Sequence, residues 1–284
     1  MRFYKNYYII FIESLKEKSK TIKNNRKKVL KMAVFAFSDL HGHINLWHQI
    51  KDFLKPDDIA YCLGDCIDRG QDNLKLLKEI IAAPNVILLR GNHEDFIISI
   101  GTKMFVANSC KVSLIEAQEE ELYTLWCHNG GFPTIEEFNS LSLQDQYNLI
   151  SAIERLPTHT EYMNSKGDII YLCHAGRQFD IDENPNPNPH SIIPMNNYLW
   201  DRNHLIDKKW RGDINEYCIH GHTPVQLLQS SYLWPPATPY FLDTDPRAIT
   251  YCEGHKIDID MGTSESHKTC LINLDTFEEI YFKE

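Results

Sequence analysis

Short apolar runs, each followed by a polar loop, recur along the chain. Five of them cover residues 34–38, 59–63, 86–89, 169–173 and 217–219. Runs of this length that end at glycine or polar residues are typical of buried strands. Ligands bind beyond the carboxyl ends of strands in open α/β sheets, so the five loops are expected to meet at one rim.

Helical patterns separate the first three runs. Residues 44–54 and 74–81 carry apolar side chains three and four positions apart, which is typical of amphipathic helices. Strands that alternate with helices predict a βαβαβ layer with right-handed crossovers, and hence an α/β protein. Residues 95–156 are long, apolar-periodic and interrupted by Asn129, Gly130 and Gly131. They predict a helical insert that covers one side of the site.

Two further strand pairs are predicted in the second half of the chain. Residues 158–163 and 169–173 flank a turn-like segment and indicate a hairpin in a second sheet. Residues 256–260 and 270–274 are expected to form the other pair. The segment before them, residues 229–254, has the composition of a long aromatic loop.

The charge of the chain is divided unevenly. Residues 1–32 hold ten Lys/Arg and two Asp/Glu, a net +8, whereas residues 33–284 hold nineteen and thirty-seven, a net −18. A segment as acidic as residues 33–284 has little general attraction for nucleic acid, and no nucleic-acid partner is expected. Residues 1–31 are predicted to be a basic N-terminal extension, frayed or disordered; an anchor for anionic partners and a targeting segment are the alternatives.

The cysteines and the hydropathy bear on the compartment. Eight cysteines occur without a CxxC pair, which favours reduced thiols and a cytoplasmic location. Cys66 is expected to act as a small hydrophobic residue, with a redox-sensitive thiol as the alternative. No apolar run approaches the roughly 20 residues of a transmembrane helix, and no secretory signal is recognisable.

Five polar motifs follow the five apolar runs in order. They are Asp39-x-His41-Gly42, Gly64-Asp65-x-x-Asp68-Arg69-Gly70, Gly91-Asn92-His93-Glu94, His174-Ala175-Gly176 and Gly221-His222-Thr223. The set resembles the metal-dependent phosphoesterases, and specifically the small bacterial and phage-type phosphoprotein phosphatases. The resemblance implies a four-layer sandwich of two mixed β-sheets flanked by helices, with residues 32–284 as the catalytic domain.

The same resemblance implies a binuclear metal centre. Asp39 and His41 would hold the first metal, Asp65 would bridge both, and the second would be held by Asn92, His174 and His222. Residues two apart on an extended segment face the same side, which suits Asp39 and His41. Oxygen and imidazole ligands suit manganese, iron, zinc or cobalt better than calcium; manganese is the expected metal, with iron, zinc or cobalt as alternatives.

The resemblance also implies a mechanism of phosphomonoester hydrolysis. A hydroxide that bridges the metals would attack phosphorus directly, while His93, oriented by Asp68, would protonate the leaving group as general acid. Arg69, Arg202 and Asn92 would bind the phosphate. Arg90 is placed with them, although an ion pair with Asp or Glu is equally compatible with the sequence.

The expected substrate is a phosphoprotein, carrying phosphoserine or phosphothreonine, or a small phosphoester. The alternative on the same scaffold is a bis(nucleosyl) tetraphosphatase or another nucleotide phosphohydrolase. Dinucleotide hydrolases tend to lack the counterpart of Asp68 and to carry Asp in place of Glu94, which disfavours this alternative. Were it correct, Trp234, Tyr240 and Phe241 would be available to stack on a base.

Overall fold

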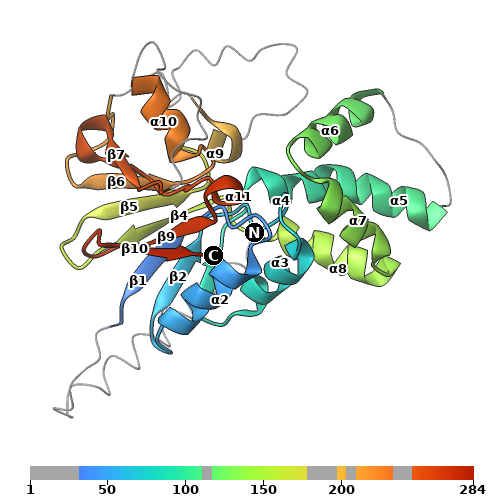
Figure 1. The fold of residues 1–284 in the computed structure, drawn as a ribbon, viewed down its shortest axis with the longest axis horizontal. Coiled ribbons are helices and arrows are strands. Elements are labelled where there is room, and N and C mark those ends of the chain that lie inside the picture. The colour runs from blue at the N-terminus through green and yellow to red at the C-terminus, as the bar shows by residue number, and fades with distance from the viewer. Residues whose placement is uncertain (1–31, 111–116, 178–196, 203–208, 233–244) are drawn as a thin grey trace, which may run out of the picture. The chain divides into compact units, whose positions relative to one another are not determined.

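The computed structural model describes residues 32–110, 117–177, 197–202, 209–232 and 245–284 (Figure 1). Within them, the chain from Ala33 to Glu284 forms one compact unit. Its strands form two mixed five-stranded sheets.

The first sheet has the strand order β10-β9-β1-β2-β3. Its strands are β1 (Val34–Phe37), β2 (Ile59–Cys62), β3 (Val86–Leu88), β9 (Lys268–Asn273) and β10 (Glu279–Lys283). The first three are parallel and are joined by helices α2 (Ile44–Phe53) and α3 (Asn73–Ala82). The predicted βαβαβ layer is therefore confirmed, and β9 extends it antiparallel to β1.

The second sheet has the strand order β4-β5-β6-β8-β7. Its strands are β4 (His159–Met163), β5 (Ile169–Cys173), β6 (Glu216–His220), β7 (Ile249–Tyr251) and β8 (Lys256–Asp258). β4 and β5 form the predicted hairpin, and β5, β6 and β8 run parallel. Parallel strands place their carboxyl ends at one edge, so the loops after β5 and β6 emerge together.

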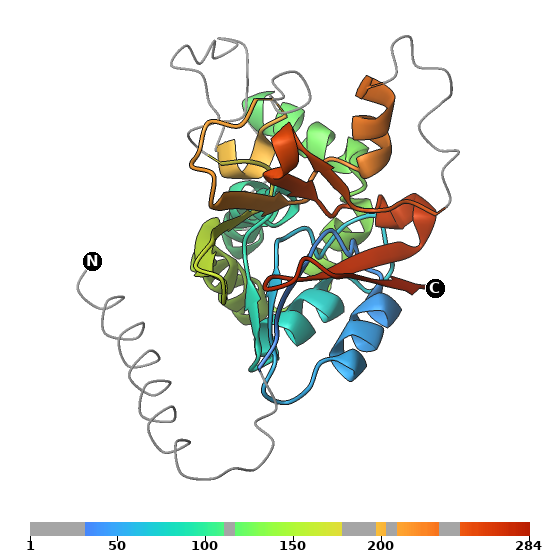
Figure 2. The same ribbon diagram turned by 90° about the vertical axis from the view of Figure 1, so that its left-hand side faces the viewer.

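The two sheets pack face to face, and β1 shows why its sequence is apolar throughout. Val34 and Ala36 join the core shared with the second sheet, whereas Phe35 and Phe37 pack in the core that includes α2 and α3. A strand buried on both faces needs apolar residues at every position. On the outer side of the second sheet, Leu228 of α10 (Val225–Tyr232) packs with Tyr251, the last residue of β7, and with Cys252. Helices thus cover both outer faces, which confirms the four-layer sandwich (Figures 1 and 2).

The helical insert is also confirmed. It comprises α4 (Asn92–Phe96), a π-helical stretch (Ile97–Gly101), α5 (Thr102–Cys110), α6 (Ala117–His128), α7 (Phe132–Ser140) and α8 (Leu143–Glu154). Asn129, Gly130 and Gly131 separate α6 from α7, as their poor helix propensity predicts. Two short helices, α9 (Asn197–Trp200) and α11 (Thr263–Ser266), follow later in the chain.

Two predictions for the second half of the chain are wrong. β8 and β9 do not pair with each other, because β8 lies between β6 and β7 whereas β9 lies between β1 and β10. The predicted loop at residues 229–254 contains the end of α10 and all of β7, and β7 is ordered by its pairing with β8. Trp234, Tyr240 and Phe241 lie outside the described residues.

The eight cysteines are free thiols, in line with the missing CxxC pair. Burial raises the pKa of Cys66 well above its usual value, so this thiol stays protonated, which favours its expected role as a small hydrophobic residue. Among the helices in the described part of the chain, none is long and apolar enough to cross a membrane.

Removal of residues 1–31 should leave two quantities unchanged: the kcat on an aryl phosphate and the metal content of the protein. The compact unit begins at Ala33, and every proposed site residue lies after it. The measurement compares the truncated and full chains, and binding to anionic vesicles at rising salt provides a second readout, because salt screens the +8 extension. A truncated chain that fails to fold would show that the extension is part of the core.

Candidate active site

The structure brings the proposed metal ligands together from five loops. Asp39 and His41 follow β1, Asp65 follows β2, and Asn92 begins α4 after β3. His174 and His222 follow β5 and β6 of the second sheet. All six side chains are buried. The site therefore lies where the carboxyl ends of parallel strands from both sheets meet.

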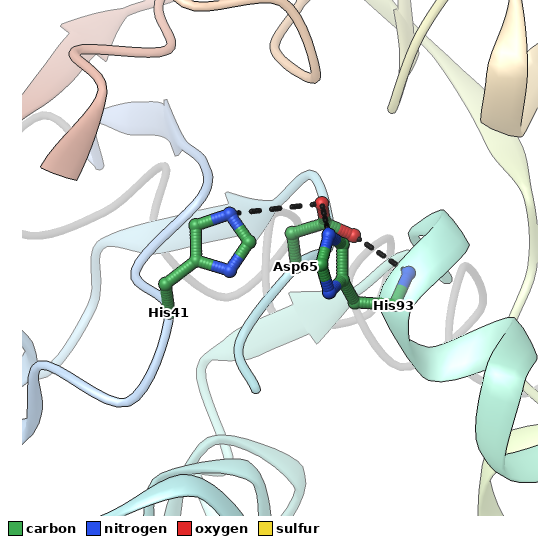
Figure 3. A group of neighbouring side chains, drawn as sticks. All are labelled: His41, Asp65 and His93. Atoms are coloured by element: carbon green, nitrogen blue, oxygen red, sulfur yellow. Dashed lines mark hydrogen bonds and ion pairs between the residues drawn. The ribbon is translucent and has the colours of Figure 1, made fainter. Parts of the chain in front are cut away.

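Asp65 contacts side chains from both sheets, and Figure 3 shows it between His41 and His93. Its Oδ2 lies 3.8 Å from Nε2 of His41, 3.6 Å from Nε2 of His93 and 3.3 Å from Nε2 of His174. Its Oδ1 accepts a hydrogen bond from the backbone N–H of His93 at 3.0 Å. One carboxylate oxygen thus faces both halves of the cluster: the half nearer the first sheet, with His41, and the half nearer the second sheet, with His174.

Asn92 organises the half of the cluster nearer the second sheet. Its Oδ1 lies 2.8 Å from Nε2 of His174 and 2.9 Å from Nδ1 of His222, and these two ring nitrogens are 3.2 Å apart. Asp39 joins the two halves, because its Oδ2 accepts from the backbone N–H of His222 at 3.2 Å and its Oδ1 lies 4.0 Å from Nε2 of His41.

Backbone carbonyls orient two of the imidazoles. Nδ1 of His41 lies 2.8 Å from the carbonyl oxygen of Ile67, and Nδ1 of His174 lies 3.1 Å from that of Leu63. A ring nitrogen that donates its proton to a carbonyl leaves the lone pair of the other nitrogen available. In both residues that other nitrogen, Nε2, faces Asp65.

The backbone at the site is unusual. Six site residues that are not glycine have positive φ: Asp39, His41, Asp65, Asp68, Arg69 and His222. Such backbone is uncommon outside glycine and concentrates at functional sites. Gly91 and Gly221 permit close packing around two of the carboxylates. A Cβ at Gly91 would lie 2.1 Å from Oδ1 of Asp65, and a Cβ at Gly221 would lie 2.0 Å from Oδ2 of Asp39.

The electrostatics of the cluster favour added positive charge. Burial, and then the charges of Asp260 and Asp65, raise the pKa of Asp39 well above its usual value. Burial also acts to raise the pKa of Asp65, but the facing His174 and His93 hold it well below its usual value. Buried carboxylates, neutral imidazole nitrogens and an amide oxygen are ligands that divalent transition metals prefer. The residues present therefore fit a metal centre.

His93 forms a second arrangement beside the cluster. Its Nδ1 lies 2.6 Å from Oδ2 of Asp68, and the same oxygen accepts a hydrogen bond from Nε1 of Trp126 at 2.8 Å. The backbone N–H of Asp68 donates to Oγ1 of Thr134 at 3.1 Å. Trp126 and Thr134 belong to the helical insert, and neither lies in one of the five sequence motifs. Trp126 closely precedes the Asn129-Gly130-Gly131 break, which is the only sequence signal near it.

Replacing Trp126 with phenylalanine should lower kcat about tenfold on a phosphoserine peptide. The change keeps an aromatic ring but removes one of the two donors to Asp68, and a hydrogen bond to a charged group contributes about 1.5–3 kcal/mol. Steady-state kinetics of Trp126→Phe and of the control Trp47→Phe test this. Trp47 is equally buried and donates to Glu79 of α3, so its variant should keep kcat. Equal losses in both would assign Trp126 a packing role only.

The arginines differ in where the structure places them. Arg69 lies at the cluster, with Nη1 2.7 Å from Nε2 of His41 and Nη2 3.2 Å from Nε2 of His93. Nε of Arg202 lies 3.2 Å from Nε2 of His222. Nε of Arg90 instead lies 3.6 Å from Oδ1 of Asp95, which favours the ion-pair alternative for this residue.

Glu94 joins two of the site loops, a role that its sequence motif does not by itself reveal. Its Oε2 accepts from the backbone N–H groups of Asp65 and Gly91, both at 2.9 Å, and its Oε1 accepts from that of Cys66 at 2.8 Å. The loop after β2 and the start of α4 are thereby held in a fixed relation. The position of Glu94 in the Gly91-Asn92-His93-Glu94 motif was the available signal.

Comparison with known families agrees with this geometry. The model of the calcineurin-like phosphoesterases matches residues 32–256. The chain belongs to the calcineurin-like phosphoesterase family. It is accordingly a metal-dependent phosphoester hydrolase, and the resemblance inferred from its five motifs is confirmed. Members of this family use a binuclear metal centre, with which the buried His and Asp clusters are consistent.

Individual relatives of this phosphoesterase are distant. Serine/threonine-protein phosphatase 1 of Salmonella typhimurium is 25% identical over 201 residues, which cover 68% of this chain and 79% of the relative. Among solved structures, a putative diadenosine tetraphosphatase has a TM-score of 0.49 at 12% identity, with 89% of this chain and 94% of that one covered. A metallophosphoesterase from Sphaerobacter thermophilus has a TM-score of 0.47 at 13% identity, with coverages of 89% and 88%.

Proposed function

We propose that this enzyme is a two-metal phosphomonoesterase that hydrolyses phosphoserine and phosphothreonine in proteins. The observation that carries the proposal is the His93–Asp68 pair, 2.6 Å apart, beside the Asp65 cluster. A relative named as a serine/threonine-protein phosphatase that aligns with 68% of the chain supports the choice of substrate.

Within this proposal, Asp39, His41 and Asp65 would hold one metal, and Asp65, Asn92, His174 and His222 the other. Bound there, two divalent metals supply positive charge against the phosphoryl oxygens and lower the pKa of water. The donor set suits manganese, which we propose as the native metal.

The remaining roles fall to side chains at the edge of the cluster. His93 donates a proton from Nε2 to the leaving alkoxide, because its Nδ1 is held by Asp68 and its Nε2 faces the cluster. Arg69 and Arg202, with Asn92, bind the phosphate oxygens, since a guanidinium matches them with two parallel donors. Arg90 is a weaker candidate for phosphate binding than Arg69 and Arg202, because its guanidinium lies beside the carboxylate of Asp95.

The proposal also covers the domain organisation, the partners and the compartment of the protein. Residues 1–31 are a basic extension to a catalytic domain at residues 32–284, and the net charge of −18 over residues 33–284 disfavours nucleic acid as a partner. The free thiols agree with the cytoplasm as the compartment.

A parallel substrate assay tests the proposed function. The metal-stripped protein is resupplied with single divalent ions and offered an aryl phosphate, a phosphoserine peptide and a dinucleoside tetraphosphate. We expect manganese to restore the highest activity and kcat/KM to favour the peptide over the dinucleotide. The variant Trp234→Ala should leave this order unchanged.

A contrary outcome would identify the alternative enzyme class. Aromatic stacking on a base contributes about 1–3 kcal/mol, so a dinucleotide hydrolase that uses Trp234 should lose activity in Trp234→Ala. A strong preference for the dinucleotide that collapses in this variant would overturn the protein-phosphatase assignment. The proposal of a metal centre would hold for either substrate preference.

A further inference from the structure

A second group of metal-ligating side chains lies outside the candidate active site. It consists of His43, His267 and Glu284, none of which belongs to the Asp65 cluster. His43 immediately precedes α2, His267 follows α11, and Glu284 follows β10. Three parts of the fold that are distant in sequence therefore deliver two imidazoles and one carboxylate to one place.

The candidate ligand atoms of this group lie within 4.8 Å of one another. Nδ1 of His43 lies 2.8 Å and Nδ1 of His267 lies 4.0 Å from the same carboxylate oxygen, Oε2 of Glu284. The two imidazole rings meet edge to face, with centroids 5.4 Å apart. Ligands of a tetrahedral zinc ion at bond lengths near 2.0–2.2 Å are about 3.3–3.6 Å apart. The observed separations bracket this range.

The backbone holds the three residues in a defined register. β10 pairs with β9 such that Lys283 lies opposite Lys268, and the N–H of Glu284 donates to the carbonyl oxygen of His267 at 2.9 Å. His43 is fixed by its own N–H, which donates to the carbonyl oxygen of Leu40 at 2.9 Å. Hydrogen bonds thus fix the backbone of all three residues beside regular elements, which hold a site more precisely than loops do.

The donor set matches one already present in the protein. The Asp65, His174 and His222 group of the active site likewise combines one carboxylate with two imidazoles, at separations of 3.3 and 3.2 Å. The new group differs in being open to solvent, since the side chains of His43, His267 and Glu284 are 13%, 56% and 22% exposed. An ion can therefore reach it without an opening of the fold, and water can fill a fourth position.

We propose that His43, His267 and Glu284 bind a divalent cation of the zinc type, separate from any metal at the active site, with water as the fourth ligand. Two imidazoles with one carboxylate and an open position are a frequent zinc donor set. The ion would tie the end of β10 to the loop that carries Asp39 and His41, because His43 lies in that loop. This site is independent of the proposed phosphatase activity.

Counting bound zinc tests the site. The full-length protein is dialysed to equilibrium against buffered free zinc, and metal per chain is measured by elemental analysis for wild type, His267→Asn and Glu284→Gln. Asparagine suits position 267, because this residue has φ of 52° and asparagine tolerates left-handed backbone. We expect each variant to bind one equivalent fewer than wild type, and to gain less in Tm when zinc is added.

A matched control separates this site from scattered surface histidines. His48 of α2 is 45% exposed and lies 3.0 Å from the carboxylate of Glu79, a pair that belongs to no such group of three in the described structure. His48→Asn should bind as much zinc as wild type. Unchanged stoichiometry in His267→Asn and Glu284→Gln would overturn the proposal, as would an equal loss in His48→Asn. Substrate assays do not enter this count, so failure of the proposed function would leave it unaffected.

Discussion

Asp65→Asn should lower kcat about a thousandfold or more and weaken the binding of metal at both halves of the cluster. Oδ2 of Asp65 faces His41, His93 and His174 within 3.8 Å, so the variant removes a charge that lies between the proposed ligands of both metals. A thousandfold loss corresponds to about 4 kcal/mol of barrier. Kinetics on an aryl phosphate and metal content per chain after dialysis measure the two effects.

Asp58→Asn is the control for this prediction. Asp58 is also a buried carboxylate, but it accepts hydrogen bonds from the backbone N–H groups of Ala33 and Lys55 and is not part of the cluster. Its variant should lose stability and keep its metal. If Asp65→Asn retained two tightly bound metals, Asp65 would not be the shared ligand.

His93→Asn should leave the metal content intact and lower kcat about 10²- to 10⁴-fold on a phosphoserine peptide. The loss should be much smaller on a nitrophenyl phosphate, because a leaving group of low pKa needs little protonation in the transition state. Asp68→Asn should show the same dependence on the leaving group, since Oδ2 of Asp68 holds Nδ1 of His93 at 2.6 Å.

The comparison of two substrates distinguishes proton donation from a structural role. A residue that only supports the fold would affect both substrates equally when replaced. Equal losses for the peptide and the nitrophenyl ester in His93→Asn would therefore exclude His93 as the general acid. Loss of metal from His93→Asn would instead show that His93 is a metal ligand. This role would fit the 3.6 Å distance between Nε2 of His93 and Oδ2 of Asp65.

The sequence by itself determined the strand ends and the residue types that they carry. Buried parallel strands must be apolar on both faces, so β1, β2, β3, β5 and β6 stand out as short apolar runs. The chemistry of metal and phosphate binding restricts the loops that follow to Asp, His, Asn and Arg at fixed spacings. The resemblance carried by these motifs named Asp39, His41, Asp65, Asn92, His174 and His222 before the fold was seen, and the structure places the six together.

Contacts between distant segments were decided only by the tertiary structure. Trp126 and Thr134 reach Asp68 from 58 and 66 residues away, and no local spacing encodes such a contact. The assignment of β8 and β9 to different sheets is of the same kind, because a short strand's periodicity shows that it is buried but not which strand lies beside it. His43, His267 and Glu284 likewise meet only because β10 pairs with β9 next to β1, a register set by the packing of the whole sheet.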